Sequence, residues 1–232
     1  HKDINSVEEV SEDIRGIIAK AKMPKDIAFA ILEQHKKLEA KFVAVRSSAT
    51  AEDSSSAAWA GQLETYLNTM EKDVLKNVQK CWSSLFTPRA IFYRFEKKMH
   101  KDKVSVAVVV QEMVQSEISG IAFTVHPVTK DRNQMVIEAG LGLGEAIVSG
   151  QVTPDTYVVH KNDFSIFDIN VSEQSFALVR GKSGGLIRTN KPIAKLHGQK
   201  LTGKQIVELA KICKNIEQHY KKPMDIEWTY VQ

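Results

Sequence analysis

The sequence predicts an α+β fold, and three of its features point that way. Apolar residues recur at helical spacing over the first forty positions, alternate with polar residues at 42–49, and dominate several short stretches after residue 104. The chain of 232 residues is 43% hydrophobic and 26% charged, which is typical of a globular protein. Its length allows one large domain or two small domains packed together.

The N-terminal region is expected to contain two helices. Ser6 and Glu9 match a capping box, and the apolar positions after them predict a helix that ends near Lys22. Pro24 suits the first turn of a second helix. We therefore expect a helical hairpin over residues 6–40.

The next segment combines strands, a loop and two helices. The run FVAVRSSA (42–49) alternates as a strand does, TAEDSSSAAWAGQ (50–62) is typical of a loop, and LETYLN (63–68) resumes the alternation. Helical periodicity predicts helices at 71–85 and 87–99, the second opened by Thr87 and Pro88.

Most of the predicted β-structure follows residue 104. Strands are expected at 104–114, 119–125, 134–138 and 225–231, with further strand-like runs in TYVVHK and SIFDINV. VSVAVVVQEMV (104–114) is apolar at nearly every position, which predicts a strand buried on both faces. GLGLGEAIVSG (140–150) is expected to turn sharply into a short helix, and 172–202 to be mainly loop with room for one strand. Thr202 and Gln205 match a capping box for a last helix.

Composition excludes several classes of protein. The net charge of +4 is spread along the chain, which favours a protein that handles anions in one pocket over one that coats nucleic acid. No apolar run reaches the roughly 18 residues of a membrane-spanning helix, and the first residues do not resemble a secretory signal. Cys81 and Cys213 fall on the apolar stripes of predicted helices, so we expect free thiols and a cytoplasmic location.

Three patterns could carry chemistry. GLGLGEA (140–146) is compatible with a tight strand-to-helix turn and with anion binding in equal measure. Arg46, at the end of an alternating strand and before a hydroxyl-rich loop, is a candidate phosphate ligand, although the pattern alone favours an ordinary exposed arginine. Asp225 and Glu227 share one face of a strand, which suits Mg²⁺ but describes a solvent-facing edge at least as well. The histidines are isolated, and no nucleophile motif is present.

Several motifs in a fixed order resemble the nucleotide-binding domain of phosphoenolpyruvate synthase and pyruvate phosphate dikinase. They are VAVRSSATAED (43–53), AGQLETYLN (60–68), CWSSLFTPRAIFYR (81–94), VSVAVVVQEMV (104–114), SGIAFTVHPVT (119–129), GLGLGEAIVSGQVTPDTY (140–157) and KPMDIEW (222–228). Rifampicin phosphotransferases share this domain and most of the motifs. The resemblance covers almost the whole chain.

The resemblance implies an ATP-grasp-like fold in which ATP lies between two lobes. It implies that Arg46 contacts the phosphates, that Gly61 and Thr65 cover them, that Gln111, Glu112, Met113 and Val114 form a hinge whose backbone recognises adenine, and that Glu227, with Asp225 beside it, binds Mg²⁺. These roles are coherent, because phosphoryl transfer depends on positioning the phosphates and neutralising their charge.

The sequence departs from the usual pattern at three places. Ser54, Ser55 and Ser56 replace a Leu-Pro-Asp segment, His126 replaces an Asn or Asp, and Met224 replaces a common Gln. None of these changes removes a residue with an implied role.

The resemblance also implies parts of a longer enzyme. A lysine motif usually precedes the helical hairpin and a Gln-x-Arg segment follows DIEW. We therefore expect an ATP-grasp-like domain truncated at both ends that by itself binds Mg·ATP weakly or not at all. Its partners would be a phosphohistidine domain and an acceptor domain of the same chain, with pyruvate as acceptor. A rifampicin-type acceptor and a non-catalytic nucleotide-sensing module are the alternatives.

Overall fold

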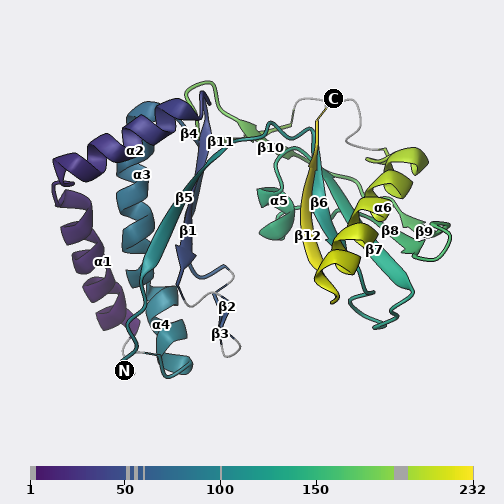
Figure 1. Ribbon diagram of the computed structural model, residues 1–232, viewed down its shortest axis with the longest axis horizontal. Coiled ribbons are helices and arrows are strands. Elements are labelled where there is room, and N and C mark those ends of the chain that lie inside the picture. The colour runs from purple at the N-terminus through teal and green to yellow at the C-terminus, as the bar shows by residue number, and fades with distance from the viewer. Residues whose placement is uncertain are drawn as a thin grey trace. The chain divides into compact units, whose positions relative to one another are not determined.

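A computed structural model describes residues 4–50, 53–54, 57–59, 61–99, 101–190 and 198–231 (Figure 1). The chain divides into two compact units, one of His1–Met113 with Gly181–Gly185, the other of Val114–Arg180 with Leu186–Gln232. Ser55 and Ser56, which depart from the family pattern, lie outside the described residues. Both units mix helices and strands, which confirms the predicted α+β class.

The first unit is built on a three-stranded antiparallel sheet of order β4-β1-β5. Its strands are β1 (Val43–Ala49), β4 (Thr65–Thr69) and β5 (Val106–Glu112). Helix α3 (Glu71–Ser83) covers one face, where Val43 and Val45 of the sheet meet Val74, Val78 and Cys81 of the helix in a buried core. A short pair, β2 (Asp53–Ser54) and β3 (Ala57–Ala58), precedes β4, and η1 (Ser84–Phe86) and α4 (Pro88–Glu96) follow α3.

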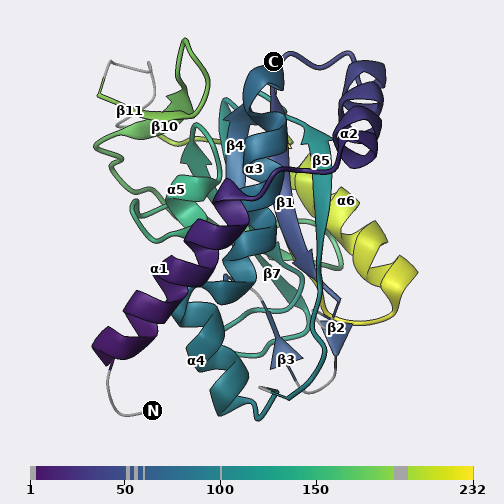
Figure 2. The ribbon, with the colours of Figure 1, turned by 90° about the vertical axis from the view of Figure 1, so that its left-hand side faces the viewer.

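Two N-terminal helices are present, but they differ in detail from the prediction. Helix α1 (Ile4–Lys20) already contains Ser6, so Ser6 is not its N-cap and the expected capping box is wrong. Pro24 is the N-cap of α2 (Lys25–Lys37). Each of the two helices packs mainly against α3, as Figure 2 shows for α1, so they do not form a simple hairpin.

Strand β5 corrects one expectation from the sequence. It lies at the edge of its sheet, paired with β1, and its residues alternate between half-buried and exposed. Val108 and Val110 pack against the core below α3, whereas Val109 is 49% exposed. The prediction of a strand buried on both faces is therefore wrong, because an apolar run does not by itself show whether both faces of its sheet are covered.

The second unit is built on a five-stranded antiparallel sheet of order β12-β6-β7-β8-β9. The strands are β6 (Ile118–Phe123), β7 (Gln134–Leu141), β8 (Asp155–His160), β9 (Ile166–Asn170) and β12 (Asp225–Tyr230). Helix α6 (Gly203–Tyr220) covers one face, where Ile206, Ala210 and Cys213 join Ile137 and Tyr157 in the core. Its N-terminus has the predicted capping box of Thr202 and Gln205.

Close backbone contacts explain the glycines of this unit. A Cβ on Gly120 would lie 1.7 Å from the carbonyl oxygen of Glu138 on the neighbouring strand. Gly142, with φ of +85°, approaches strand β10 (Ala177–Arg180) so closely that a Cβ would lie 2.5 Å from Leu178 O. The glycine-rich segment thus makes a tight turn into the short helix α5 (Glu145–Val148), which is one of its two sequence interpretations.

The region 172–202 holds two strands where the sequence leaves room for one. Strands β10 (Ala177–Arg180) and β11 (Leu186–Thr189) pair as an antiparallel hairpin. The turn Gly181–Gly185 groups with the first unit, where Gly185 N donates to Asn68 O over 3.1 Å. None of the described helices has the length and apolar character that a membrane span requires.

A fully buried ion pair fixes the segment before α6. Lys200 Nζ lies 2.8 Å from Asp155 Oδ1, and both side chains are completely shielded from solvent. Asp155 also accepts hydrogen bonds from the Lys200 backbone N, from Tyr157 OH and from Ser172 N. Lys200 Nζ donates in addition to Ser172 O. The two buried charges thus have partners on several sides, which offsets the cost of removing them from water.

We predict that Asp155→Asn strongly destabilises the second unit. The substitution leaves the Lys200 ammonium buried without its counter-charge, and such a loss costs about 3–5 kcal/mol. Urea denaturation measures the change, with Glu33→Gln as control, since Glu33 pairs with Lys37 at 3.3 Å on the exposed surface of α2. The control is expected to change stability by less than about 1 kcal/mol. Equal losses of stability in the two variants would contradict the structural role of the buried Asp155–Lys200 ion pair.

We also predict that both cysteines resist thiol reagents in the folded protein. Cys81 and Cys213 are free and buried. Burial raises the pKa of Cys81 to about 12, with the Glu64 charge adding to the effect, and burial raises the pKa of Cys213 to about 11. Both groups therefore remain neutral thiols at pH 8. Titration with a chromogenic disulfide should label them only after denaturation, and rapid labelling of the native chain would disprove this.

Candidate functional site

The central strand of the first unit presents Arg46 away from α3. Val45 and Ser47 point toward the helix, so the alternation of β1 places Arg46 on the opposite face of the sheet. There Arg46 is directly opposite Thr65 of β4 and Val109 of β5. Directly opposed residues have Cβ atoms about 4.5–5.5 Å apart, and all three are exposed. A cation and a hydroxyl that are far apart in sequence thus lie side by side.

Gly61 belongs to the turn that leads into β4. Its φ of +70° lies in the left-handed region, and none of the described residues comes within 4 Å of the position that its Cβ would occupy. The turn is closed by a hydrogen bond from Gln62 N to Trp59 O of 3.0 Å. Trp59 is buried and contacts Tyr93 edge to face, with ring centres 5.2 Å apart. Glycine is therefore required here by backbone conformation, in an anchored turn.

The expected hinge residues lie at the end of β5 and just after it. Gln111 pairs with Ala44, so it shares the face of Arg46, and Glu112 pairs with Val43. Met113 N donates to Phe42 O over 3.0 Å and continues the pairing by one residue. The boundary between the two units falls between Met113 and Val114, inside the segment that the sequence singles out.

The acidic pair of the second unit lies on edge strand β12. Ile226, Trp228 and Tyr230 pack toward the core beneath α6, whereas Asp225 and Glu227 are exposed on the other face. The predicted sharing of one face is therefore confirmed. Carboxylate oxygens suit Mg²⁺, which commonly takes one or two carboxylates and completes its shell with phosphate and water. Among the residues that the structure describes, no group of three or more His, Cys, Asp or Glu side chains could hold a metal ion.

Glu138 is an acid that the sequence reasoning missed. Glu227 pairs with Ile121, and Ile121 pairs with Glu138, so the three residues form one row across β12, β6 and β7. The two acids are about 9–10 Å apart along this row, given the usual spacing of strands. Glu138 is half-buried, and this burial raises its pKa above the ordinary value. The signal for it was an acid inside the otherwise apolar run MVIEAGL.

Two departures from the family pattern have a simple structural setting. His126 Nδ1 accepts hydrogen bonds from Val128 N and Thr129 N, both at 3.3 Å. Asn and Asp side chains commonly accept backbone hydrogen bonds in turns, so the substitution preserves the acceptor. Met224 N donates to Thr124 Oγ1 over 2.8 Å through its backbone, which any residue except proline could do.

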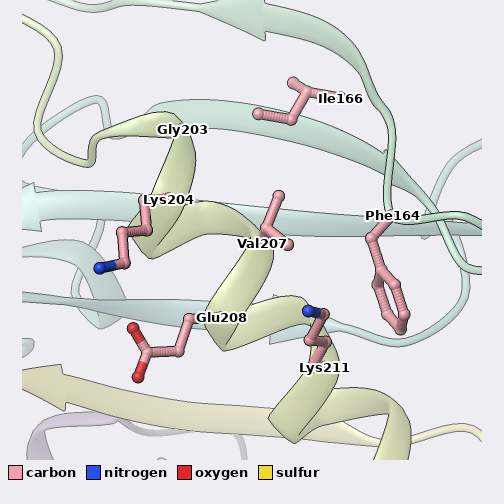
Figure 3. Close-up of a pocket in the computed structure, with 7 residues that line it drawn as sticks. All are labelled: Phe164, Ile166, Gly203, Lys204, Val207, Glu208 and Lys211. Atoms are coloured by element: carbon pink, nitrogen blue, oxygen red, sulfur yellow. The ribbon is translucent and has the colours of Figure 1, made fainter.

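An open groove of about 810 Å³ lies elsewhere in the second unit, between the start of α6 and the turn before β9 (Figure 3). Phe164 and Val207 contribute apolar surface, while Lys204 and Glu208 carry opposite charges along α6. Lys211 Nζ stands 5.7 Å from the centre of the Phe164 ring. None of the residues singled out from the sequence lines this groove.

Comparison with known proteins gives a consistent answer. The family model described as "Pyruvate phosphate dikinase, AMP/ATP-binding domain" matches residues 1–232. A protein of Methanocaldococcus jannaschii named "Probable phosphoenolpyruvate synthase" is 46% identical over 98% of this chain and 20% of its own length. The "Phosphoenolpyruvate synthase" of Pyrococcus furiosus is 43% identical over 98% of this chain and 30% of its own. The "Rifampicin phosphotransferase" of Bacillus subtilis is 40% identical over 98% of this chain and 26% of its own.

These matches define the class as a nucleotide-binding domain. More specifically, the chain belongs to the pyruvate phosphate dikinase AMP/ATP-binding domain family, as the sequence motifs predict. It spans about a fifth to a third of the length of the curated relatives that it matches.

We predict that Glu138→Gln stabilises the chain at neutral pH. Because the pKa of Glu138 is raised in the folded state, the folded chain binds more protons than the unfolded chain between the two pKa values, and stability falls as pH rises through that window. The neutral amide avoids this loss. Denaturation midpoints at pH 7 and pH 4 test this prediction, with substitution of the exposed Glu208, Glu208→Gln, as control. The gain in stability of Glu138→Gln over the wild type should be present at pH 7 and shrink at pH 4. An equal gain at both values would contradict the explanation.

Proposed function

We propose that this chain is the ATP-binding domain of a phosphoenolpyruvate synthase-like phosphotransferase. The overall reaction would convert ATP, pyruvate and water into AMP, phosphoenolpyruvate and phosphate, with a phosphohistidine on another domain of the same chain as the intermediate carrier. The observation that carries the proposal is the pairing of Arg46 and Thr65 on one exposed sheet face, since both are motif residues to which the family resemblance gives phosphate-binding roles. The names of the relatives from Methanocaldococcus jannaschii and Pyrococcus furiosus support pyruvate as the acceptor.

In this proposal the first unit binds the phosphates through its exposed sheet face. The Arg46 guanidinium offers planar donors to phosphate oxygens, and the Thr65 hydroxyl adds a neutral donor next to it. Gly61 lets the backbone approach the phosphates, because no described residue comes within 4 Å of the position that its Cβ would occupy. The proposed fold type is ATP-grasp-like, and the backbone of Gln111, Glu112, Met113 and Val114 would recognise adenine.

The second unit supplies the acids for Mg²⁺. Glu227 and Asp225 are exposed carboxylates on one face of β12, and no core packing depends on their charge. They would hold the ion through hard oxygen ligands. When bound, Mg²⁺ neutralises charge on the phosphate oxygens during transfer. The residues of this chain orient the nucleotide, and the phosphohistidine carrier allows one nucleotide site to serve a separate acceptor site.

A rifampicin-type acceptor is a second candidate, supported by the 40% identity to the Bacillus subtilis enzyme. The ATP-dependent half of the reaction is the same in both cases. A cytoplasmic location belongs to the proposal as well, and the two buried free thiols agree with it.

Two substitutions test the proposed site in the full-length protein. Arg46→Ala and Glu227→Gln each remove a charge-assisted contact, so each should weaken Mg·ATP binding by about tenfold or more. Calorimetric titration with Mg·ATP measures this. Arg89→Ala on α4 and Glu208→Gln on α6 are matched controls, because both residues are exposed and lie outside the site.

Activity assays of the full-length protein distinguish pyruvate from a rifampicin-type acceptor. Formation of AMP that depends on pyruvate supports the synthase, and formation that depends on rifampicin supports the alternative. If Arg46→Ala and Glu227→Gln bind Mg·ATP like their controls, the site assignment is wrong. Binding of ATP without turnover of either acceptor would favour the nucleotide-sensing module.

A further inference from the structure

We propose that Arg15 and Glu64 are positioning residues for the nucleotide site, and that they hold Thr65 and Arg46 in register from the opposite side of the sheet. This inference rests on the proposed function. Arg15 belongs to α1, which contributes none of the proposed ligand residues. The link between α1 and the site runs through a small set of hydrogen bonds around Glu64.

The first step is the direction of the side chains around Thr65. Glu64 and Tyr66 flank Thr65, and the Tyr66 ring packs with the core beneath α3. Tyr66 OH donates a hydrogen bond to Glu64 Oε2, so the Glu64 carboxylate also lies on the helix side. Thr65, between them, faces the other way, next to Arg46. Fixing Glu64 and Tyr66 therefore fixes the direction in which Thr65 points.

The second step is the anchor that α1 provides. Arg15 Nη2 lies 2.8 Å from Glu64 Oε1 and 3.0 Å from Glu64 Oε2. The side chains of Arg15 and Glu64 are 33% and 27% exposed, so the pair is only partly shielded and is expected to add little to global stability. Helix α1 itself lies across α3 (Figure 2). The contact thus ties the start of β4 to the helical layer.

The third step links the same residue to the strand that carries Arg46. Glu64 O accepts hydrogen bonds from Ser47 N over 3.3 Å and from Ser47 Oγ over 2.5 Å. Cys81 Sγ of α3 approaches the same oxygen at 3.6 Å. Ser47 directly follows Arg46, so the backbone carbonyl of Glu64 is hydrogen-bonded to β1. The carboxylate of Glu64 accepts hydrogen bonds from Arg15 and Tyr66. One residue therefore joins both strands at the level of the proposed phosphate ligands.

The protonation states suit a permanent anchor. Burial raises the pKa of Tyr66, and its hydrogen bond to the Glu64 carboxylate adds to the rise, so the phenol remains a donor at neutral pH. Arginine keeps its charge throughout this range. The two side chains that donate to the Glu64 carboxylate therefore keep their protons near pH 7, which suits a positioning role.

The test compares Mg·ATP affinity in variants of the full-length protein. Glu64→Gln and Arg15→Gln should each weaken binding by about three- to tenfold, because the ligand residues lose their fixed geometry while remaining present. Arg15→Lys retains the charge and should restore part of the affinity. Ser11→Ala is the control on the same helix, since Ser11 Oγ donates to Phe86 O at 2.6 Å and has no contact with Glu64. It should leave affinity unchanged even where it lowers stability.

A double-mutant cycle separates positioning from general destabilisation. If Glu64 acts through Arg46, the loss caused by Glu64→Gln should be much smaller in an Arg46→Lys background than in the wild type. Wild-type affinity in both Arg15→Gln and Glu64→Gln would overturn the inference, as would equal losses in Ser11→Ala. The inference would also be overturned if Glu64→Gln weakened Mg·ATP binding as much in the Arg46→Lys background as in the wild type, so that the two effects simply add. If the wild-type protein itself does not bind Mg·ATP, the proposed function fails instead.

Discussion

The alternation of side chains along antiparallel strands is the constraint on which the rest of this structure depends. Each sheet buries one face under a helix, so every second residue of its strands is committed to the core. Exposed positions among the remaining ones can carry polar groups at fixed spacing. Arg46 and Thr65 in one unit, and Glu227 and Asp225 in the other, all occupy such exposed positions. A shift of register by one residue would bury these groups, so the packing that stabilises each unit also specifies its chemistry.

Local patterns predicted most of the elements because those elements depend on local physics. The Thr202 capping box, the Thr87-Pro88 helix start and the alternation of 225–231 all form as expected. The errors came from features that only neighbours decide. Nothing in VSVAVVVQEMV shows that one face of the strand is exposed, and Ser6 could not be recognised as an interior helix residue. The β10–β11 hairpin was missed because its strands are short and lie in a polar segment.

The candidate site was predicted by resemblance more than by residue pattern. Spacing alone ranked Arg46 as an ordinary surface arginine, and only the antiparallel register brings it opposite Thr65. Glu138 could not be assigned to the row of Glu227, because that needs the order of three strands. The proposed positioning residues could not be found from the sequence either. Arg15 and Glu64 are far apart in sequence, and an arginine on a predicted helix does not indicate which carboxylate it binds. Sequence reasoning finds candidate ligands, whereas the groups that hold them in place emerge from tertiary structure.

The turn Gly181–Gly185 has a consequence for synthesis on the ribosome. This turn groups with the first unit, where Gly185 N donates to Asn68 O. A chain that emerges from its N-terminus at roughly 5–20 residues per second presents Met113 several seconds before Gly185. Throughout that interval the end of β4 lacks this backbone donor. The first unit must therefore wait for a segment encoded well inside the second before this hydrogen bond can form, which couples the folding of the two units in time.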